Sequence, residues 1–323
     1  MLNRRQMIAS LTAMSWGQVS LAQGNFPSKT IRIVVPFGAG GIADLTARAV
    51  GERLAERLGQ AIVIDNRPSA GGIVAGDLVA KSEPDGHTLL LMSNGTAVSA
   101  GLFKSLPFNP RTDFAPISLL GLFDMAVVVP ENSPYKSIAE LMAHAKANPG
   151  KLNLGTINIG STQNLAAELM RTQSGLDLQI VPLNGPHALL NALRGGQIDL
   201  AVEILGPLKP QINAKAIKLL AVMGDQRPKD WPEVPALQES PGMSGFNVSS
   251  WNALAAPAKT PKPVLDRLAS EVAKALAEPE LIKRLAGLQV NAQSSSPAQL
   301  AQLLDRDLIR WREVIQKAGI PLQ

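Results

Sequence analysis

Short β-branched stretches alternate with amphipathic helical stretches along nearly the whole chain, and no other feature limits the fold as strongly. Residues 31–35 form one β-branched run, and residues 43–58 carry apolar side chains at helical spacing. Strands are predicted again at 61–65 and 88–92, with a helix at 74–81 between them. This alternation favours an α/β fold with mostly parallel sheets and helices on both faces.

The middle and the end of the chain repeat this pattern. Gly195 and Gly196 end one of the predicted helices, and Ser161 is a typical start for another. The predicted strands are 125–129, 152–155, 178–181, 198–202, 218–222 and 251–255, and the predicted helices are 137–147, 161–173, 188–194, 263–277 and 297–317.

Two connecting stretches suggest that these elements form two doubly wound α/β domains. One is rich in strand-forming residues at 117–129, and the other is rich in proline and turn residues at 225–245. The chain would then cross twice between the domains. Domain 1 is predicted to be discontinuous, with residues 23–124 and 246–323, and domain 2 to be the insertion 125–245. Ligands of such folds bind outside the carboxyl ends of parallel strands, so a cleft between the domains is the expected site.

The first 22 residues have the layout of a secretory signal peptide. Arg4 and Arg5 are followed by an uncharged, mildly apolar stretch at 7–16, and small residues at Ser20 and Ala22 precede a predicted cleavage site. Export to the periplasm is therefore expected. The apolar stretch is too short to span a bilayer.

Composition excludes several classes of protein. The chain has no cysteine, so neither disulfides nor thiolate chemistry contribute to it. Its 31 basic and 26 acidic residues give a net charge of +5, and Arg4 and Arg5 contribute two of these charges. That balance is too mild for a protein that binds nucleic acid. With 46% hydrophobic residues, the chain is able to form large cores.

Glycine turns follow four of the predicted strands. They lie at Gly38–Gly41, at 66–73, at Ser93–Thr96 and at Gly155–Thr162. Glycine lets the backbone approach a ligand closely, and the free N–H groups at a helix start attract an anion. The turns offer N–H groups, hydroxyls and amides but no cluster of Lys or Arg. They therefore predict a site that holds one or two carboxylates through dipoles, hydroxyls and bridging water.

The first turn also fits a different motif. Gly38, Gly40 and Ala43 match the dinucleotide fingerprint G-x-G-x-x-A, and Asp65 ends the next strand, where an acid would bind the ribose. An oxidoreductase that binds an NAD-type dinucleotide is therefore an alternative. Against it, Pro36 and Phe37 separate the strand from the glycines, whereas the fingerprint places its first glycine in the turn itself.

Six sequence motifs resemble the Bug receptors, the periplasmic solute-binding components of tripartite tricarboxylate transporters. Together they cover nearly the whole mature chain. They are Pro-Phe-x-x-Gly-Gly-x-x-Asp from Pro36, Asn-Arg-Pro-x-Ala-Gly-Gly from Asn66, Pro-Asp-Gly-His-Thr-Leu from Pro84, Asp-Phe-Ala-Pro-Ile-Ser from Asp113, Ala-Asn-Pro-Gly-Lys-Leu-Asn from Ala147, and Ser-Trp-Asn-Ala-Leu-Ala-Ala-Pro from Ser250.

The resemblance implies a fold like that of type II periplasmic binding proteins, with two domains that close on a ligand. It implies a small carboxylate, either an organic acid or an amino acid, held largely by the first two turns. It implies no reaction and no cofactor. The expected partners are transporter components in the membrane or, alternatively, a sensor, and the protein is expected to be a monomer.

The residues predicted to bind the ligand come from the glycine turns and from the matching positions of the second domain. Asp44 has two possible roles, binding a ligand's ammonium group or occupying a helix start as a favourable acid. The predicted set is Phe37, Gly38, Ala39, Gly40, Gly41, Asp44, Ser69, Ala70, Gly71, Asn94, Thr96, Asn158, Gly160, Ser161, Thr162, Asn164, Asn184, Gly185, His187 and Glu203.

Some positions depart from the family pattern. Leu183 and Asn184 stand where relatives often have Tyr and Lys, and Glu203 stands where Asp is common. These departures concern the part of the pocket away from the carboxylate.

Enzymatic and metal-binding functions find little support in the sequence. Its three histidines, His87, His144 and His187, are far apart and lack a nearby acidic ligand pattern, so no metal site is predicted. No serine lies in a G-x-S-x-G motif. Ser161 and His187 are the only conceivable nucleophile and base, and neither has a recognisable orienting partner.

Overall fold

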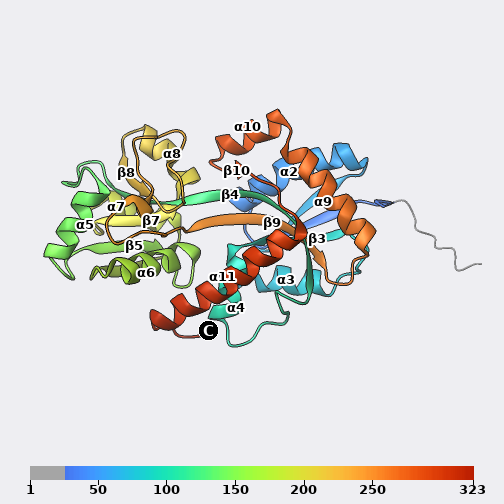
Figure 1. Cartoon of the computed structure of the whole chain (residues 1–323), viewed down its shortest axis with the longest axis horizontal. Coiled ribbons are helices and arrows are strands. Elements are labelled where there is room, and N and C mark those ends of the chain that lie inside the picture. Colours follow the sequence, from blue (N-terminus) through green and yellow to red (C-terminus); the bar gives the residue numbers. More distant parts are fainter. Residues whose placement is uncertain (1–25) are drawn as a thin grey trace, which may run out of the picture.

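The computed structural model describes residues 26–323, which form an elongated molecule of two α/β halves (Figure 1). The predicted signal peptide lies outside these residues. In the part of the chain described, ten strands form one sheet in the order β2-β1-β3-β9-β4-β7-β5-β6, with β8 and β10 also paired to β4. No helix within residues 26–323 is long and apolar enough to cross a membrane.

The first half of the molecule is built around a sheet whose edge strands are parallel. β1 (Ile31–Val35) pairs in parallel with β2 (Ile62–Asn66) and β3 (Thr88–Ser93). The helices and short elements of this half are α2 (Ile42–Leu58), η1 (Ala70–Gly72), α3 (Ile73–Ala80), α4 (Asn94–Leu102), α9 (Lys262–Leu276), α10 (Pro279–Gly287), β10 (Asn291–Ala292) and α11 (Pro297–Lys317). Buried side chains place α2, α9 and α10 on one face and α3, α4 and α11 on the other.

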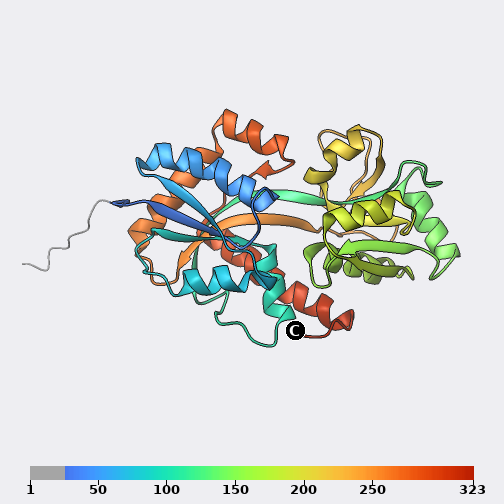
Figure 2. The same cartoon turned by 180° about the vertical axis from the view of Figure 1, so that it is seen from behind.

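The second half repeats this arrangement around β5 (Asn153–Ile157). β5 pairs in parallel with β6 (Gln179–Leu183) and β7 (Leu200–Ile204). Its other elements are α5 (Ile138–Ala147), α6 (Thr162–Ser174), α7 (Pro186–Arg194), α8 (Leu205–Asn213), β8 (Ile217–Val222) and η2 (Leu237–Glu239). α5 and α6 share one hydrophobic core, while α7 and α8 cover the opposite face (Figure 2).

Two long strands join the halves. β4 (Phe114–Pro130) pairs antiparallel with β9 (Ser249–Pro257) up to Asp124, and from Met125 onward it pairs with β7 and β8. One strand therefore belongs to both halves. The sequence predicted a strand at 125–129 and a strand-rich crossing that begins at 117. It did not predict that both belong to one uninterrupted strand.

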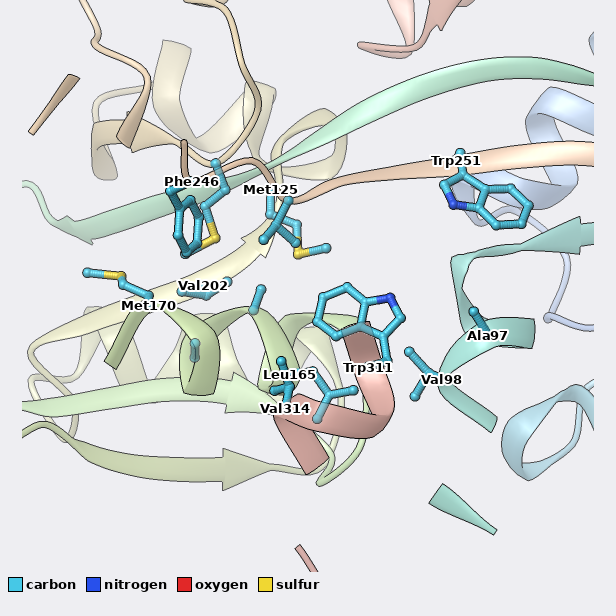
Figure 3. Packing of buried hydrophobic residues seen from close by; sticks show 14 of the residues in the cluster. Ala97, Val98, Met125, Leu165, Met170, Val202, Phe246, Trp251, Trp311 and Val314 are labelled. Atoms are coloured by element: carbon cyan, nitrogen blue, oxygen red, sulfur yellow. The ribbon is translucent and has the colours of Figure 1, made fainter. Parts of the chain in front are cut away.

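One hydrophobic core runs through both halves on the side of α11. It includes Trp251 and Val98 of the first half together with Leu165 and Val202 of the second, and Trp311 of α11 lies among them (Figure 3). Two indole N–H groups fix this helix: Trp311 Nε1 donates to Asn94 Oδ1 (2.6 Å), and Trp251 Nε1 donates to Asp307 Oδ2 (2.7 Å). Buried indoles need such partners.

The prediction of a turn at Ser93–Thr96 was wrong, because these residues begin α4. Ser93 caps this helix: its Oγ accepts from Gly95 N–H, and its own N–H donates to Thr96 Oγ1. Asn94 and Gly95 are typical turn residues, but the helix is held by packing of Ala97, Val98 and Leu102 in the core. α8 and α10 were not predicted, because they contain Pro207, Pro210 and Pro279 and proline is disfavoured inside a helix.

Asp124 lies at the point where β4 passes from one half to the other. Its substitution tests how much this half-buried carboxyl group lowers the stability of the folded protein. Burial raises its pKa, although Ser249 Oγ donates to Asp124 Oδ1 at 2.7 Å. The folded state therefore binds a proton that the unfolded state releases, and stability falls as the pH rises from about 4 through the folded-state pKa. We expect Asp124→Asn, which keeps an acceptor oxygen, to be more stable than the wild type by about 1 kcal/mol at neutral pH.

Urea unfolding of both proteins from pH 4 to pH 8 checks this expectation, since all other titrating groups cancel in the difference. The gain from the substitution should vanish toward about pH 4. A variant that is less stable than the wild type at neutral pH would contradict the expectation.

Candidate functional site

A cavity of about 620 Å³ lies between the two halves, at the carboxyl ends of their parallel strands. The first half contributes the stretch that joins β1 to α2, the turn before α3, and the β3–α4 junction. The second half contributes the β5–α6 stretch, and the crossing strands supply Phe123, Met125, Ser250 and Asn252. The predicted position of the site is therefore where the structure has its large cavity.

The start of α2 lines this cavity. Gly41, Ile42 and Ala43 line it, and no side chain caps the N-terminus of this 17-residue helix. The free N–H groups and the aligned peptide dipoles of such a helix start favour a negative charge. Phe37 lies beside this helix start, partly exposed at the cavity wall.

Gly38, Ala39 and Gly40 are exposed and do not line the cavity. Gly40 instead has a structural role, because its N–H donates to Asp44 Oδ2 at 2.8 Å. The predicted set thus includes three turn residues that shape the loop rather than face the cavity.

Asp44 is buried beneath the first turn and does not face the cavity. It accepts hydrogen bonds from Gly40 N–H, from Arg48 Nε (3.0 Å) and from Asn66 Nδ2 (3.0 Å). Burial alone would raise the pKa of Asp44, but the hydrogen bonds from Arg48, Gly40 and Asn66 outweigh it and hold the pKa below its ordinary value. The geometry favours the second of its two possible roles, an acid that fixes the helix start.

The second turn forms the adjacent wall. Ser69, Ala70, Gly71 and Gly72 all line the cavity. Ser69 Oγ accepts from Val74 N–H at 3.1 Å, and Ser99 Oγ donates to Gly71 O at 2.6 Å. Gly71 has a φ of 63°, and a Cβ there would lie 2.5 Å from Phe103 Cε2. The positive φ and the short distance to Phe103 both favour glycine at this position.

The second half presents the turn after β5. Asn158, Gly160, Ser161 and Thr162 line the cavity, as predicted. Asn164 lies behind them: it accepts from Gly160 N–H (3.0 Å) and donates to Thr156 Oγ1 (3.2 Å). Asn164 therefore shapes this turn instead of facing the cavity.

The remaining predicted residues are not cavity residues either. Asn184 and His187 are exposed and Gly185 is half-buried, and none of the three lines the cavity. Thr96 does line it, whereas Asn94 is buried against Trp311. Glu203 is buried behind the wall, where Oε1 accepts from Gln163 Nε2 (2.6 Å) and from Ile204 N–H (2.7 Å). Burial raises the pKa of Glu203 despite these two bonds.

Several lining residues were missed by the sequence analysis. Gln163 and Asn252 are the most informative, since both are polar and almost fully buried. Asn252 is the one polar residue in the predicted strand 251–255. A single amide among apolar residues could have indicated a site residue. The others are Gly72, Ser93, Gly95, Ser99 and Ser250 together with apolar residues such as Leu102, Phe103 and Phe108.

Among residues 26–323, Ser161 and His187 do not meet at the cavity. Ser161 Oγ donates to Ile157 O (3.1 Å) and accepts from Asn164 N–H (3.1 Å), while His187 lies outside the cavity. Asp65, the acid of the dinucleotide alternative, pairs with Arg67 at 2.9 Å. Among residues 26–323, no group of three or more His, Asp or Glu is placed to hold a metal ion.

Comparison with known proteins settles the family. The sequence model of the tripartite tricarboxylate transporter family receptor matches residues 46–320. The chain belongs to this receptor family. The resemblance seen in the sequence is thereby confirmed, and the family accounts for the two-half architecture and the cavity between the halves.

Three solved structures are similar to this receptor along most of its length. Periplasmic binding protein BugD is 31% identical, covers 92% of this chain and 100% of its own, and has a TM-score of 0.78. A protein of R. palustris solved with adipate is 30% identical, covers 93% and 100%, and has a TM-score of 0.81. MatC from Rhodopseudomonas palustris, with bound malate, is 32% identical, covers 90% and 100%, and has a TM-score of 0.76. These similarities confirm the predicted periplasmic binding protein fold.

The role of Asp44 can be tested by stability alone. Its folded-state pKa is lowered, so it stabilises the protein above about pH 4, and this contribution is lost as the pH falls through the folded-state pKa. We expect Asp44→Ala to lower the free energy of unfolding by about 1–3 kcal/mol at pH 7 and by less below about pH 4.

Asp266→Ala is the matched control, because Asp266 also pairs with a cation one helical turn away, Lys262, but on the exposed surface. It should cost less than about 1 kcal/mol. Equal losses for the two variants, measured by urea unfolding, would show that Asp44 does not hold the first turn.

Proposed function

We propose that this protein is a periplasmic solute receptor that captures a small carboxylate between its two halves and releases it unchanged. The single observation that carries this proposal is the uncapped start of α2 at the cavity, beside the turn at 69–72. A carboxylate there would accept hydrogen bonds from backbone N–H groups, directly or through water, and would meet the positive end of the helix dipole.

The relatives support the same ligand class. Two similar proteins were solved with adipate and with malate, both of which are small carboxylates. The dinucleotide alternative is not favoured, because Gly38 and Gly40 lie away from the cavity and Asp65 is engaged by Arg67.

Ligand capture in our proposal depends on movement of the halves. Domain 1 comprises residues 23–124 and 246–323, and domain 2 comprises residues 125–245. A ligand that contacts both would favour the closed arrangement, since only that arrangement gives it both sets of contacts. A monomer exported with residues 1–22 as its signal peptide would then present the closed form to transporter components in the membrane or to a sensor.

A thermal-shift screen tests the carboxylate. Any acid that binds the folded protein raises its melting temperature, and at about 100 times its Kd it adds about 2.7 kcal/mol of stability. We expect at least one acid from a panel of organic acids and amino acids to do so. The methyl ester of that acid is the matched control and should give no shift. A shift with NAD and with none of the acids would refute the proposal.

Gly71 tests whether the second turn holds the carboxylate. Gly71→Ala strains the backbone and brings Cβ against Phe103, so we expect affinity for the acid to fall by about tenfold or more. Gly175→Ala is the matched control: Gly175 also has a positive φ, of 65°, but nothing lies within 4 Å of a Cβ there. Calorimetric titration should show unchanged affinity for Gly175→Ala. Equal affinity in both variants would remove the second turn from the site.

A further inference from the structure

The cavity has no ionic side chain on any wall. Its polar lining consists of backbone groups, hydroxyls and the amides of Asn158, Gln163, Asn252 and Gln323, and the rest is apolar. A carboxylate at the start of α2 uses the one anion-attracting feature described above. A second anion on the same ligand would have to be held elsewhere in the cavity.

The helix that starts on the opposite wall, α6, differs from α2 in having a side-chain cap at its N-terminus. At the start of α6, Ser161 Oγ accepts from Asn164 N–H, Asn164 Oδ1 accepts from Gly160 N–H, and Ser161 N–H donates to Asn158 O. These bonds satisfy the N–H groups of Gly160, Ser161 and Asn164 with the protein's own acceptors, and they leave those of Thr162 and Gln163 at the cavity. α2, in contrast, has no side-chain cap.

Two acids, Glu203 and Asp124, are neighbours of lining residues. Glu203 lies behind Gln163, and Asp124 lies between the lining residues Phe123 and Met125. Glu203 is buried and Asp124 is half-buried, and neither has a cation within salt-bridge distance among the described residues. Neither residue supplies a positive charge that could hold a second anion.

Asn252 is a lining side chain whose two polar atoms are both buried and both without a hydrogen-bond partner. It is only 1% exposed, it lines the cavity, and neither Oδ1 nor Nδ2 has a partner within residues 26–323. Its strand neighbour Trp251 is satisfied by Asp307. A buried amide without partners is unfavourable unless a ligand or water supplies them.

Gln163 adds a second neutral group to the same cavity. Its Nε2 donates to Glu203 Oε1, so the side chain is held in one orientation and its Oε1 is the atom left for other contacts. Asn252 offers one donor group and one acceptor, and Gln163 offers an acceptor. Such amides complement a hydroxyl or a carbonyl.

Building on the carboxylate site proposed above, we propose that the ligand carries a single carboxylate and, beyond an apolar body, a neutral hydroxyl or carbonyl group bound by Asn252. The apolar body would lie against side chains such as Leu102, Phe103 and Met125. Asn252 is then a specificity-determining residue that favours hydroxy or oxo monocarboxylates over dicarboxylates of the same length.

The test compares acids that differ only at the far end. Butanoate, hexanoate and octanoate are each titrated calorimetrically beside their ω-hydroxy acids and beside succinate, adipate and suberate. We expect the ω-hydroxy acid of the best-fitting length to bind about tenfold or more tightly than both the plain acid and the dicarboxylate. A dicarboxylate that binds most tightly would overturn this inference and leave the carboxylate site standing. If none of these acids binds, nor any other carboxylate, the proposed function itself fails.

The variant Asn252→Leu removes the amide at nearly constant size. It should abolish the advantage of the hydroxy acid over the plain acid. Asn191→Leu, on the exposed side of α7, is the matched control and should preserve the full pattern. Should Asn252→Leu not fold, Asn252→Ala serves the same comparison. If the variant weakens binding of all three ligand types equally, Asn252 does not recognise the group at the end of the ligand away from the carboxylate.

Discussion

The antiparallel pairing of β4 with β9 is the interaction on which the rest of this structure depends. β4 continues from that pairing into the second half, where β7 and β8 take up its other edge. Because the same strand serves both sheets, the positions of the two groups of strand ends are linked through one backbone. The cavity lies where these ends meet, and Phe123 and Met125 of β4 form part of its wall.

α11 reinforces this link from the outside. It contacts α4 and α6, one from each half, and its Trp311 lies in the core that both halves share. The indole bonds of Trp311 to Asn94 and of Trp251 to Asp307 give this core a fixed orientation, since an indole N–H buried without an acceptor is unfavourable. A movement of the halves must therefore be accommodated around α11.

The buried acids of this receptor support its backbone. Asp44 holds the first turn, Asp124 accepts from Ser249 at the crossing, and Glu203 orients Gln163. None of the three lines the cavity. The walls are left neutral, and anion binding depends on oriented N–H groups and a helix dipole, which need no desolvated cation.

The sequence by itself determined the alternating α/β pattern, the family, and the turns that approach the ligand. Glycine and helix periodicity are local signals, so 31–35, 43–58 and the turn at Ser69–Gly71 were recognisable without a fold. Only the tertiary structure decided which polar residues face the cavity. Asp44, Asn94 and Glu203 turn away because partners distant in sequence bind them, whereas Asn252 lies on a cavity wall and has no hydrogen-bond partner among residues 26–323. Those partners come together only when the sheet is assembled, and no spacing along the chain encodes them.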